Sequence, residues 1–200
     1  MEGISSGVRV ILFEPRALIR TGVCSFLKQS NCTVIPCSSI EHLSEQLYAL
    51  TDEKIILLAG AGGLGNMLPG LIRIIHSSRK MPLTSVVYTP GKEALLAKMF
   101  IAAGADSCLR EDALESQLMT EITAPNAAQP RGEQFSPAEL SIVLDYAAGM
   151  QTRDIAKRRK CSYKTVFTFK RNARLRMDLG SHAGWTNLMS HLSQLTSLYE

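Results

Sequence analysis

Cationic residues that could bind a polyanion are concentrated between residues 152 and 177. Residues 135–200 hold ten Lys or Arg against five Asp or Glu, a balance of +5, whereas residues 1–134 hold twelve against thirteen, a balance of −1. Because phosphate contacts supply most of the sequence-independent affinity for nucleic acids, this asymmetry predicts a polyanionic partner. A basic face that is merely solvated is the alternative interpretation.

Two short helices separated by a tight turn are expected to position these cations. Ile155 and Ala156 fall on inward positions of the first helix, and Ser162 can cap the second by accepting a backbone N–H. Four apolar residues then recur at helical spacing and predict a buried stripe: Val166, Phe169, Ala173 and Met177. The opposite side carries Lys164, Thr168, Arg171 and Arg174. A helix divided in this way fits the major groove of DNA.

The outward residues of the second helix are expected to divide into base contacts and phosphate contacts. Arg171 can pair bidentately with guanine, and Phe167 or Thr168 can contact a thymine methyl group. Packing or dimerisation is the alternative role of Phe167. The predicted surface comprises Lys164, Phe167, Thr168 and Arg171 toward the bases, with Lys157, Arg158, Lys160, Lys170 and Arg174 toward the phosphates. Thr165 is also predicted to belong to the DNA-binding surface.

Residues 1–122 alternate between strand-like and helix-like segments. Apolar strands are expected at 8–13, 33–37, 54–59, 85–89 and 106–110, and amphipathic helices at 16–29, 40–50, 67–78, 92–103 and 113–122. This alternation predicts an α/β domain with a doubly wound, five-stranded parallel sheet. The strand 54–59, which is apolar throughout after Lys54, should be central. Residues 123–134, with two prolines and a glycine, predict a mobile linker to an all-α domain at 135–200.

The last third of the chain resembles the LuxR-type helix-turn-helix of the NarL/FixJ response regulators. The resemblance rests on a set of residues in register: Phe135-Ser-Pro-Ala-Glu139, Val143-Leu144, Ala148-Gly149, Ile155-Ala156, Ser162, Lys164-Thr165-Val166, Asn172 and Arg176-Met177. Phe169 stands where the family often has His. The resemblance implies that a final amphipathic helix, 185–198, packs the domain and pairs it with a second copy, with packing alone as the alternative.

The first domain resembles a receiver of that family in layout, but the residues that carry phosphoryl chemistry there are replaced. The acidic pair becomes Leu12-Phe13, with only Glu14 nearby, and the phosphoacceptor position falls on Ala59 or, one residue earlier, Leu58. Thr89 stands at the switch position, with simple turn chemistry as its alternative role, and Arg110 replaces the Lys. Without a carboxylate cluster nothing neutralises the charge of Mg²⁺, and phosphoryl transfer depends on that charge neutralisation.

The sequence therefore predicts a degenerate, receiver-like domain that cannot accept phosphate. We expect Arg110 to be able to form an ion pair with Glu14 across the carboxyl ends of the strands, which would fix the shape of the empty pocket. The glycine run 59–65 resembles a phosphate-cradling loop, but the fingerprint spacing and a following lysine are both missing. A flexible loop over the pocket is the favoured interpretation.

Other classes of function find little support in the sequence. No Ser/His/Asp, Cys/His or HExxH arrangement occurs, and the five cysteines form no CxxC pair, so we expect no enzyme, cofactor or metal site. No signal peptide precedes the first strand, and the longest apolar run, 55–61, is strand-sized, so reduced thiols in a cytoplasmic protein are expected.

These observations predict a transcription regulator that binds double-stranded DNA independently of phosphorylation. It would act as a homodimer or as a heterodimer with a related response regulator. The alternative is an adaptor that modulates another regulator by binding it, without itself contacting DNA.

Overall fold

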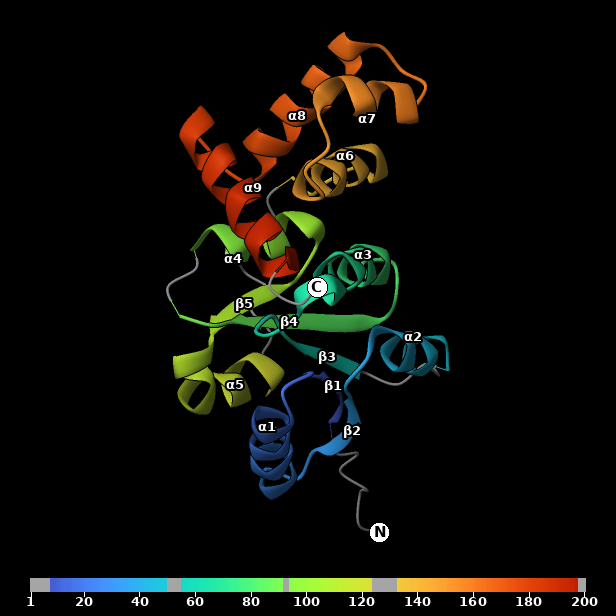
Figure 1. The fold of residues 1–200 in the computed structure, drawn as a ribbon. Coiled ribbons are helices and arrows are strands. Elements are labelled where there is room, and N and C mark those ends of the chain that lie inside the picture. The colour runs from blue at the N-terminus through green and yellow to red at the C-terminus, as the bar shows by residue number, and fades with distance from the viewer. Residues whose placement is uncertain (1–7, 50–54, 92–93, 124–132, 198–200) are drawn as a thin grey trace.

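The chain folds into a sheet-containing body and a helical body that lie end to end (Figure 1). A computed structural model describes residues 8–49, 55–91, 94–123 and 133–197. The strands are β1 (Arg9–Phe13), β2 (Thr33–Cys37), β3 (Ile55–Gly60), β4 (Leu83–Thr89) and β5 (Ser107–Arg110). They pair in parallel in the order β2-β1-β3-β4-β5. The predicted five-stranded, doubly wound sheet is confirmed.

The central place of β3 follows from its composition. All six of its residues are buried, and it pairs with β1 on one side and with β4 on the other. The register aligns Phe13 with Ala59 and Ala59 with Val87, while Thr89 aligns with Arg110. Because all strands are parallel, the loops that follow them gather at one edge of the sheet, where open α/β sheets bind ligands.

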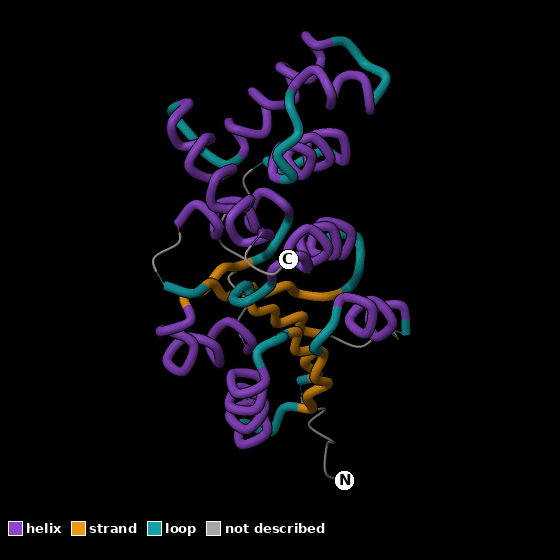
Figure 2. The backbone as a smooth tube through the Cα atoms, in the orientation of Figure 1, coloured by secondary structure: helices purple, strands orange, loops and turns teal. Residues whose placement is uncertain are grey.

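Helices cover both faces of the sheet, as the tube in Figure 2 also shows. Alternate residues of each strand point to opposite faces, so Ile11 and Phe13 join one apolar cluster while Val10 and Leu12 join the other. One face is covered by α1 (Ala17–Gln29) and α5 (Leu114–Thr123), and the other by α2 (Ile40–Tyr48), α3 (Leu68–Ser78) and α4 (Ala94–Ala103). Short 3-10 turns precede two of the helices, η1 (Gly65–Met67) and η2 (Glu111–Ala113).

The helical body begins with a capping box. The Ser136 hydroxyl accepts the Glu139 N–H at 3.2 Å, and the Glu139 carboxylate accepts the Ser136 N–H at 2.7 Å, so two backbone donors are satisfied where the helix begins. The helices are α6 (Pro137–Ala147), α7 (Thr152–Arg158), α8 (Tyr163–Arg176) and α9 (His182–Ser197). The predicted order of helices is confirmed, although the last helix begins three residues earlier than the expected 185.

Residues 133–135 attach the helical body to the sheet-containing body. Phe135 is fully buried, and its N–H donates to the Ala102 carbonyl at the end of α4 at 2.8 Å. The Arg79 guanidinium donates to the Gln134 side-chain oxygen at 3.0 Å and to the Phe135 carbonyl at 3.1 Å. Gln134, predicted as the last residue of a mobile linker, is therefore held in place, and Thr123 is the last residue of α5. Residues 124–132 of that predicted linker lie outside the described residues.

The two bodies also share apolar contacts. The helix α9 lies against η1 and α4, and residues of both bodies belong to one continuous apolar cluster, including Leu68, Phe100, Phe135, Trp185 and Leu192. This arrangement places α9 at the junction and leaves α7 and α8 at the end of the molecule farthest from the sheet (Figure 1).

Candidate nucleic-acid interface

A tight turn joins α7 to α8 and sets their relative direction. Lys160 adopts a left-handed backbone conformation, with φ of 51°, directly after α7 ends. Ser162 then caps α8: its hydroxyl accepts the Thr165 N–H at 3.0 Å and lies 2.7 Å from the Thr165 hydroxyl. Thr165, predicted to face DNA, is half-buried and is engaged by this cap. Its side chain therefore orders the start of α8.

The inward stripe of α8 is present as predicted. Val166, Ala173 and Met177 are buried, and Phe169 is partly buried against the cluster that contains Val166. Ile155 and Ala156 of α7 pack in the same small cluster as Val166. Packing on one side thereby fixes which residues of α8 face outward.

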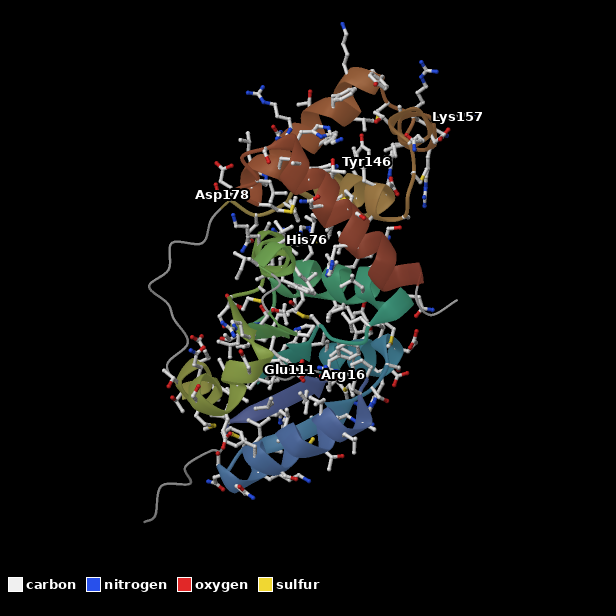
Figure 3. All side chains as sticks on the ribbon, turned by 60° about the vertical axis from the view of Figure 1, so that its left-hand side comes forward. Arg16, His76, Glu111, Tyr146, Lys157 and Asp178 are labelled. Carbon is white, nitrogen blue, oxygen red and sulfur yellow. The ribbon has the colours of Figure 1, made fainter. Side chains whose placement is uncertain are left out.

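The predicted base-reading residues of α8 are exposed, namely Lys164, Phe167, Thr168 and Arg171. On α7 and the turn, Lys157, Arg158 and Lys160 are exposed as well. Figure 3 shows Lys157 at the outer end of the molecule, far from the labelled Arg16 and Glu111 of the sheet-containing body. The two helices thus present one polar, cationic surface to solvent.

A buried acid of α6 anchors the turn beneath that surface. The Asp145 carboxylate accepts two hydrogen bonds from the Arg159 guanidinium, at 2.8 and 3.1 Å, and lies 3.4 Å from Arg158. The hydrogen bond to Asp145 raises the pKa of Arg159. Arg158 keeps a side chain that is 60% exposed, so it remains available to solvent despite this neighbour. Sequence reasoning missed Asp145 and Arg159 because only the fold brings α6 and the turn together.

The end of α8 is anchored in a similar way. The Arg176 guanidinium donates to Glu139 at 2.7 Å and to Glu133 at 2.7 Å. Burial by itself would raise the pKa of Glu139, but the hydrogen bonds from the Ser136 backbone and from Arg176 outweigh it and lower that pKa. The capping box of α6 and the last turn of α8 are therefore one connected network.

One of the predicted phosphate contacts, Lys170, is directed inward instead. The Lys170 ammonium lies 4.8 Å from the centre of the Tyr146 ring and 5.2 Å from that of Trp185, and burial followed by the charge of Arg174 lowers its pKa. Arg174 is half-buried, and its Nε has no hydrogen-bond partner among the described residues. Because the Lys170 ammonium lies over rings of α6 and α9, its prediction as an outward phosphate ligand is wrong for this structure. The same prediction for Arg174 stays a prediction.

The predicted receiver pocket is occupied by an arginine side chain. Glu14 is fully buried and accepts hydrogen bonds from the Tyr88 hydroxyl at 2.7 Å, from the Arg16 N–H at 2.8 Å and from the Arg16 guanidinium at 2.8 Å. The same guanidinium donates to Glu111, in η2, at 2.8 Å. The hydrogen bond with Glu14 raises the pKa of Arg16, and burial followed by the Glu14 charge raises that of Tyr88. One cation thereby bridges two carboxylates at the carboxyl edge of the sheet.

The expected ion pair between Arg110 and Glu14 is wrong. Arg110 is exposed and pairs with Asp112, two residues along the chain, because β5 ends there and the side chain turns outward. The partner of Glu14 is Arg16 instead, because both residues lie in the short loop between β1 and α1. No local pattern indicates that Glu111, 95 residues after Arg16, completes the site.

The other predicted pocket residues offer no nucleophile at this edge. Leu12 and Phe13 are fully buried in opposite apolar clusters, and Ala59 is fully buried between β1 and β4. Thr89 is buried at the end of β4, within hydrogen-bonding reach of the Cys108 thiol.

The glycine run is packed against the arginine rather than lying as a flexible loop over an empty pocket. A Cβ added at Gly62 would lie 2.6 Å from the Arg16 guanidinium carbon, and one at Gly60 would lie 2.3 Å from a Glu14 oxygen. Ala61 and Leu64 of the same segment are buried. These glycines are required because the guanidinium and the carboxylate fill the space that side chains would need.

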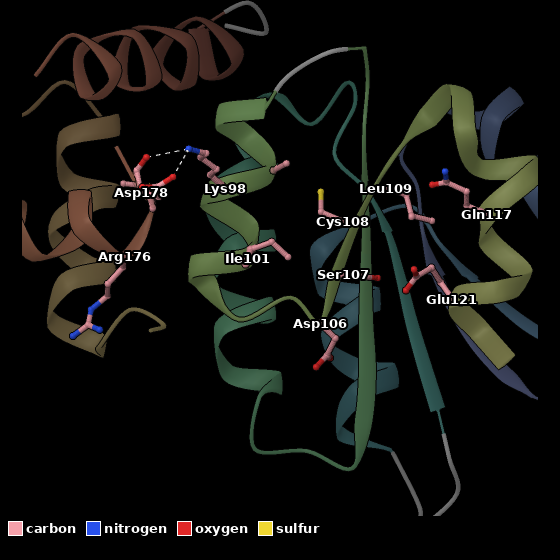
Figure 4. Close-up of a pocket in the computed structure, with 12 residues that line it drawn as sticks. Lys98, Ile101, Asp106, Ser107, Cys108, Leu109, Gln117, Glu121, Arg176 and Asp178 are labelled. Carbon is pink, nitrogen blue, oxygen red and sulfur yellow. Dashed lines mark hydrogen bonds and ion pairs between the residues drawn. The ribbon is translucent and has the colours of Figure 1, made fainter. Parts of the chain in front are cut away.

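A second concave region lies beside the junction of the two bodies (Figure 4). This groove of about 480 Å³ is lined by residues of α4, β5, α5 and the end of α8. The Lys98 ammonium in its wall donates to the Asp178 carbonyl at 3.0 Å and to the Asp178 carboxylate at 3.1 Å, which ties α4 to the second residue after α8. Within the described residues no cluster of metal-ligating side chains occurs, and no helix there has the length and apolar character needed to cross a bilayer.

Comparison with known proteins identifies the class of the helical body. Residues 133–189 match the luxR family of bacterial regulatory proteins, so the segment from α6 into α9 is a LuxR-type helix-turn-helix domain. No curated protein matches the sequence of the chain.

Solved structures match over most of the chain. The complex of the two-component response regulator RcsB with DNA has a TM-score of 0.57 at 20% identity, over 92% of this chain and 100% of that one. The RcsB response regulator of Salmonella typhimurium has a TM-score of 0.52 at 18% identity with the same coverage. A structure of two RcsB dimers on two parallel DNAs has a TM-score of 0.50 at 19% identity, over 92% and 98%. At these identities the likeness establishes the fold, a receiver-like sheet followed by a helix-turn-helix domain.

Proposed function

We propose that the protein is a sequence-specific, DNA-binding transcription regulator. The observation that carries the proposal is the exposed cationic surface of α7 and α8, which a buried stripe on the opposite side of α8 holds outward. The N-terminal part of the second helix of such a unit contacts base edges in the major groove. The LuxR-type match and the likeness in fold to an RcsB–DNA complex support the same function.

The test is binding of the full chain to duplex DNA, measured by fluorescence anisotropy over a range of salt concentrations. We expect log affinity to fall linearly with log salt, because each phosphate contact releases counterions. Arg171→Ala should lower affinity for a selected site by about 1–3 kcal/mol with less effect on random DNA, whereas Lys157→Ala should weaken both equally. Lys28→Ala, an exposed cation of α1, is the matched control. No binding at low salt would refute the proposal and favour the adaptor.

Independence from phosphorylation belongs to the same proposal. It is supported by Ala59 at the phosphoacceptor register and by the Arg16 guanidinium between Glu14 and Glu111. The Arg16 guanidinium already donates hydrogen bonds to both carboxylates, so a divalent ion would have to displace it to bind them. Incubation with Mg²⁺ and acetyl phosphate should add no phosphoryl mass and leave DNA affinity unchanged. A Mg²⁺-dependent mass increase would refute this part of the proposal.

Dimerisation, with a second copy or with a related response regulator, completes the proposal. The apolar residues Trp185, Leu188 and Leu192 of α9 are buried within the chain, so pairing through that face would require α9 to leave the junction. We therefore assign pairing to the receiver-like part of the chain. Sedimentation of the full chain, with and without a two-half-site duplex, should detect two chains per duplex. Binding of one chain to such a duplex at saturation would contradict this assignment.

A further inference from the structure

Two aromatic side chains are exposed at the start of α8. Tyr163 is 48% exposed and Phe167 is 46% exposed, although large aromatic surfaces are ordinarily buried. Their rings meet edge to face, with centroids 4.7 Å apart and an angle of 68° between the planes. The spacing of four residues puts both on one side of the helix. We call Tyr163 and Phe167 the aromatic pair.

The aromatic pair lies where a recognition helix meets base edges. Tyr163 is the first residue of α8, directly after the Ser162 cap, and Phe167 is one turn further along. The N-terminal residues of the second helix in a helix-turn-helix are those that contact bases. Lys164, Thr168 and Arg171 occupy the neighbouring strip of the same exposed side, at helical spacing. A duplex that these polar residues contact would also bring its groove floor to the aromatic pair.

The major groove offers one ordinary apolar group, the 5-methyl group of thymine. Every other base-edge feature there is a hydrogen-bond donor or acceptor, which an aromatic ring matches poorly. Resting on the proposed function, we infer that the aromatic pair is a specificity element that contacts thymine methyl groups at neighbouring positions of each half-site. Sequence reasoning singled out Phe167 for such a contact. The structure adds Tyr163 and the edge-to-face geometry that joins the two rings into one apolar surface.

The test exploits the fact that deoxyuridine differs from thymidine only by that methyl group. Duplexes are first selected from a random pool by the full-length protein, and each thymine of the bound half-site is then replaced by deoxyuridine, one at a time. Removing a buried methyl group costs a factor of about four in affinity. We expect this loss at one or two thymines for the wild-type chain and at no other position.

Variants of Phe167 and Tyr163 show whether the aromatic pair causes the loss of affinity on deoxyuridine substitution. In Phe167→Ala, deoxyuridine at the sensitive thymines should lower the affinity less than twofold, because the ring that contacts the methyl group is absent. Tyr163→Ala should show the same change to a smaller degree. Phe167→Leu should retain the sensitivity because it keeps an apolar side chain. Leu175→Ala is the matched control, since Leu175 is an exposed apolar residue of the same helix, 67% exposed, near its other end. Circular dichroism shows whether each variant keeps its helical content.

The outcomes separate the inference from the proposed function. If no duplex is selected and no salt-dependent binding occurs, both fail. If selected duplexes bind specifically but tolerate deoxyuridine at every position, the inference is overturned while the DNA-binding function stands. Sensitivity that persists in Phe167→Ala and Tyr163→Ala also overturns it. Should Phe167→Ala instead change the number of chains bound per duplex without changing deoxyuridine sensitivity, the pair is a contact between copies and the inference is wrong.

Discussion

Arg16 and Gly62 should be energetically coupled, because the glycine lacks a side chain where the guanidinium lies. A Cβ at residue 62 would be 2.6 Å from the guanidinium carbon and from one of its nitrogens, well inside van der Waals contact. Gly62→Ala would therefore force the guanidinium away from Glu14 and Glu111, to which it donates hydrogen bonds. In Arg16→Ala the obstacle is absent, and the same methyl group enters free space.

The expected magnitudes follow from burial. Removing one partner of a buried ion pair costs about 3–5 kcal/mol. Glu14 is fully buried but keeps the Tyr88 hydroxyl and the backbone N–H of residue 16, and the Arg16 side chain is 29% exposed, so we expect the lower end, about 3 kcal/mol, for Arg16→Ala. Gly62→Ala should cost about 2 kcal/mol by overpacking in the wild-type chain. In the Arg16→Ala background it should be neutral or stabilising by up to about 1 kcal/mol.

The assay is urea unfolding of the four full-length proteins at pH 7, followed by far-ultraviolet circular dichroism. Gly22→Ala is the control, since a Cβ there meets no atom within 4 Å, and a helical glycine replaced by alanine should gain about 1 kcal/mol. An equal loss of stability from Gly62→Ala in both backgrounds would refute the reasoning, because it would mean that Arg16 does not fill the pocket in solution.

Three further predictions test the helical body. Lys157→Met should reduce the slope of log affinity against log salt by about 0.9, the value for one phosphate contact, whereas Lys170→Met should leave the slope unchanged because that ammonium lies over two rings. Ser162→Ala should cost about 1 kcal/mol in thermal unfolding through loss of the α8 cap, whereas Ser25→Ala, at an exposed position within α1, is the control. The pKa of Glu139 is lower in the folded chain than in the unfolded chain. Its carboxylate therefore stabilises the fold at pH values above the unfolded-state pKa of about 4.3, and this stabilisation is lost as the pH falls through the folded-state pKa. Glu139→Gln should therefore flatten the acid limb of stability against pH, and an unchanged limb would show that the carboxylate is not the group responsible.

Periodicity was sufficient to predict the elements of this fold. The unbroken apolar run of β3 identified the centre of the sheet, and the inward spacing of Val166, Ala173 and Met177 determined which side of α8 faces solvent. Both signals are local, and both report burial directly. The boundaries were less exact at β4, which begins at Leu83 rather than at the expected 85, and at α9, which begins at His182 rather than at 185.

The contacts that the sequence did not reveal are long-range or depend on packing angles. Arg16 meets Glu111 across 95 residues, which no spacing rule connects. Lys170 falls near the border between the inward and outward sides of α8, so the position of Tyr146 and Trp185 decides its direction. Arg110 found a partner two residues away, which satisfies its charge at less conformational cost than a distant one.

The burial of Phe135 against the end of α4 has a consequence for chimeric proteins. Transplanting the helical body onto the sheet of another protein would remove the end of α4 that meets Phe135, and the η1 and α4 surfaces against which α9 lies. Such a hybrid protein would also need the residues of α4 and η1 that contact the helical body, because the junction of the two bodies is part of one continuous apolar core.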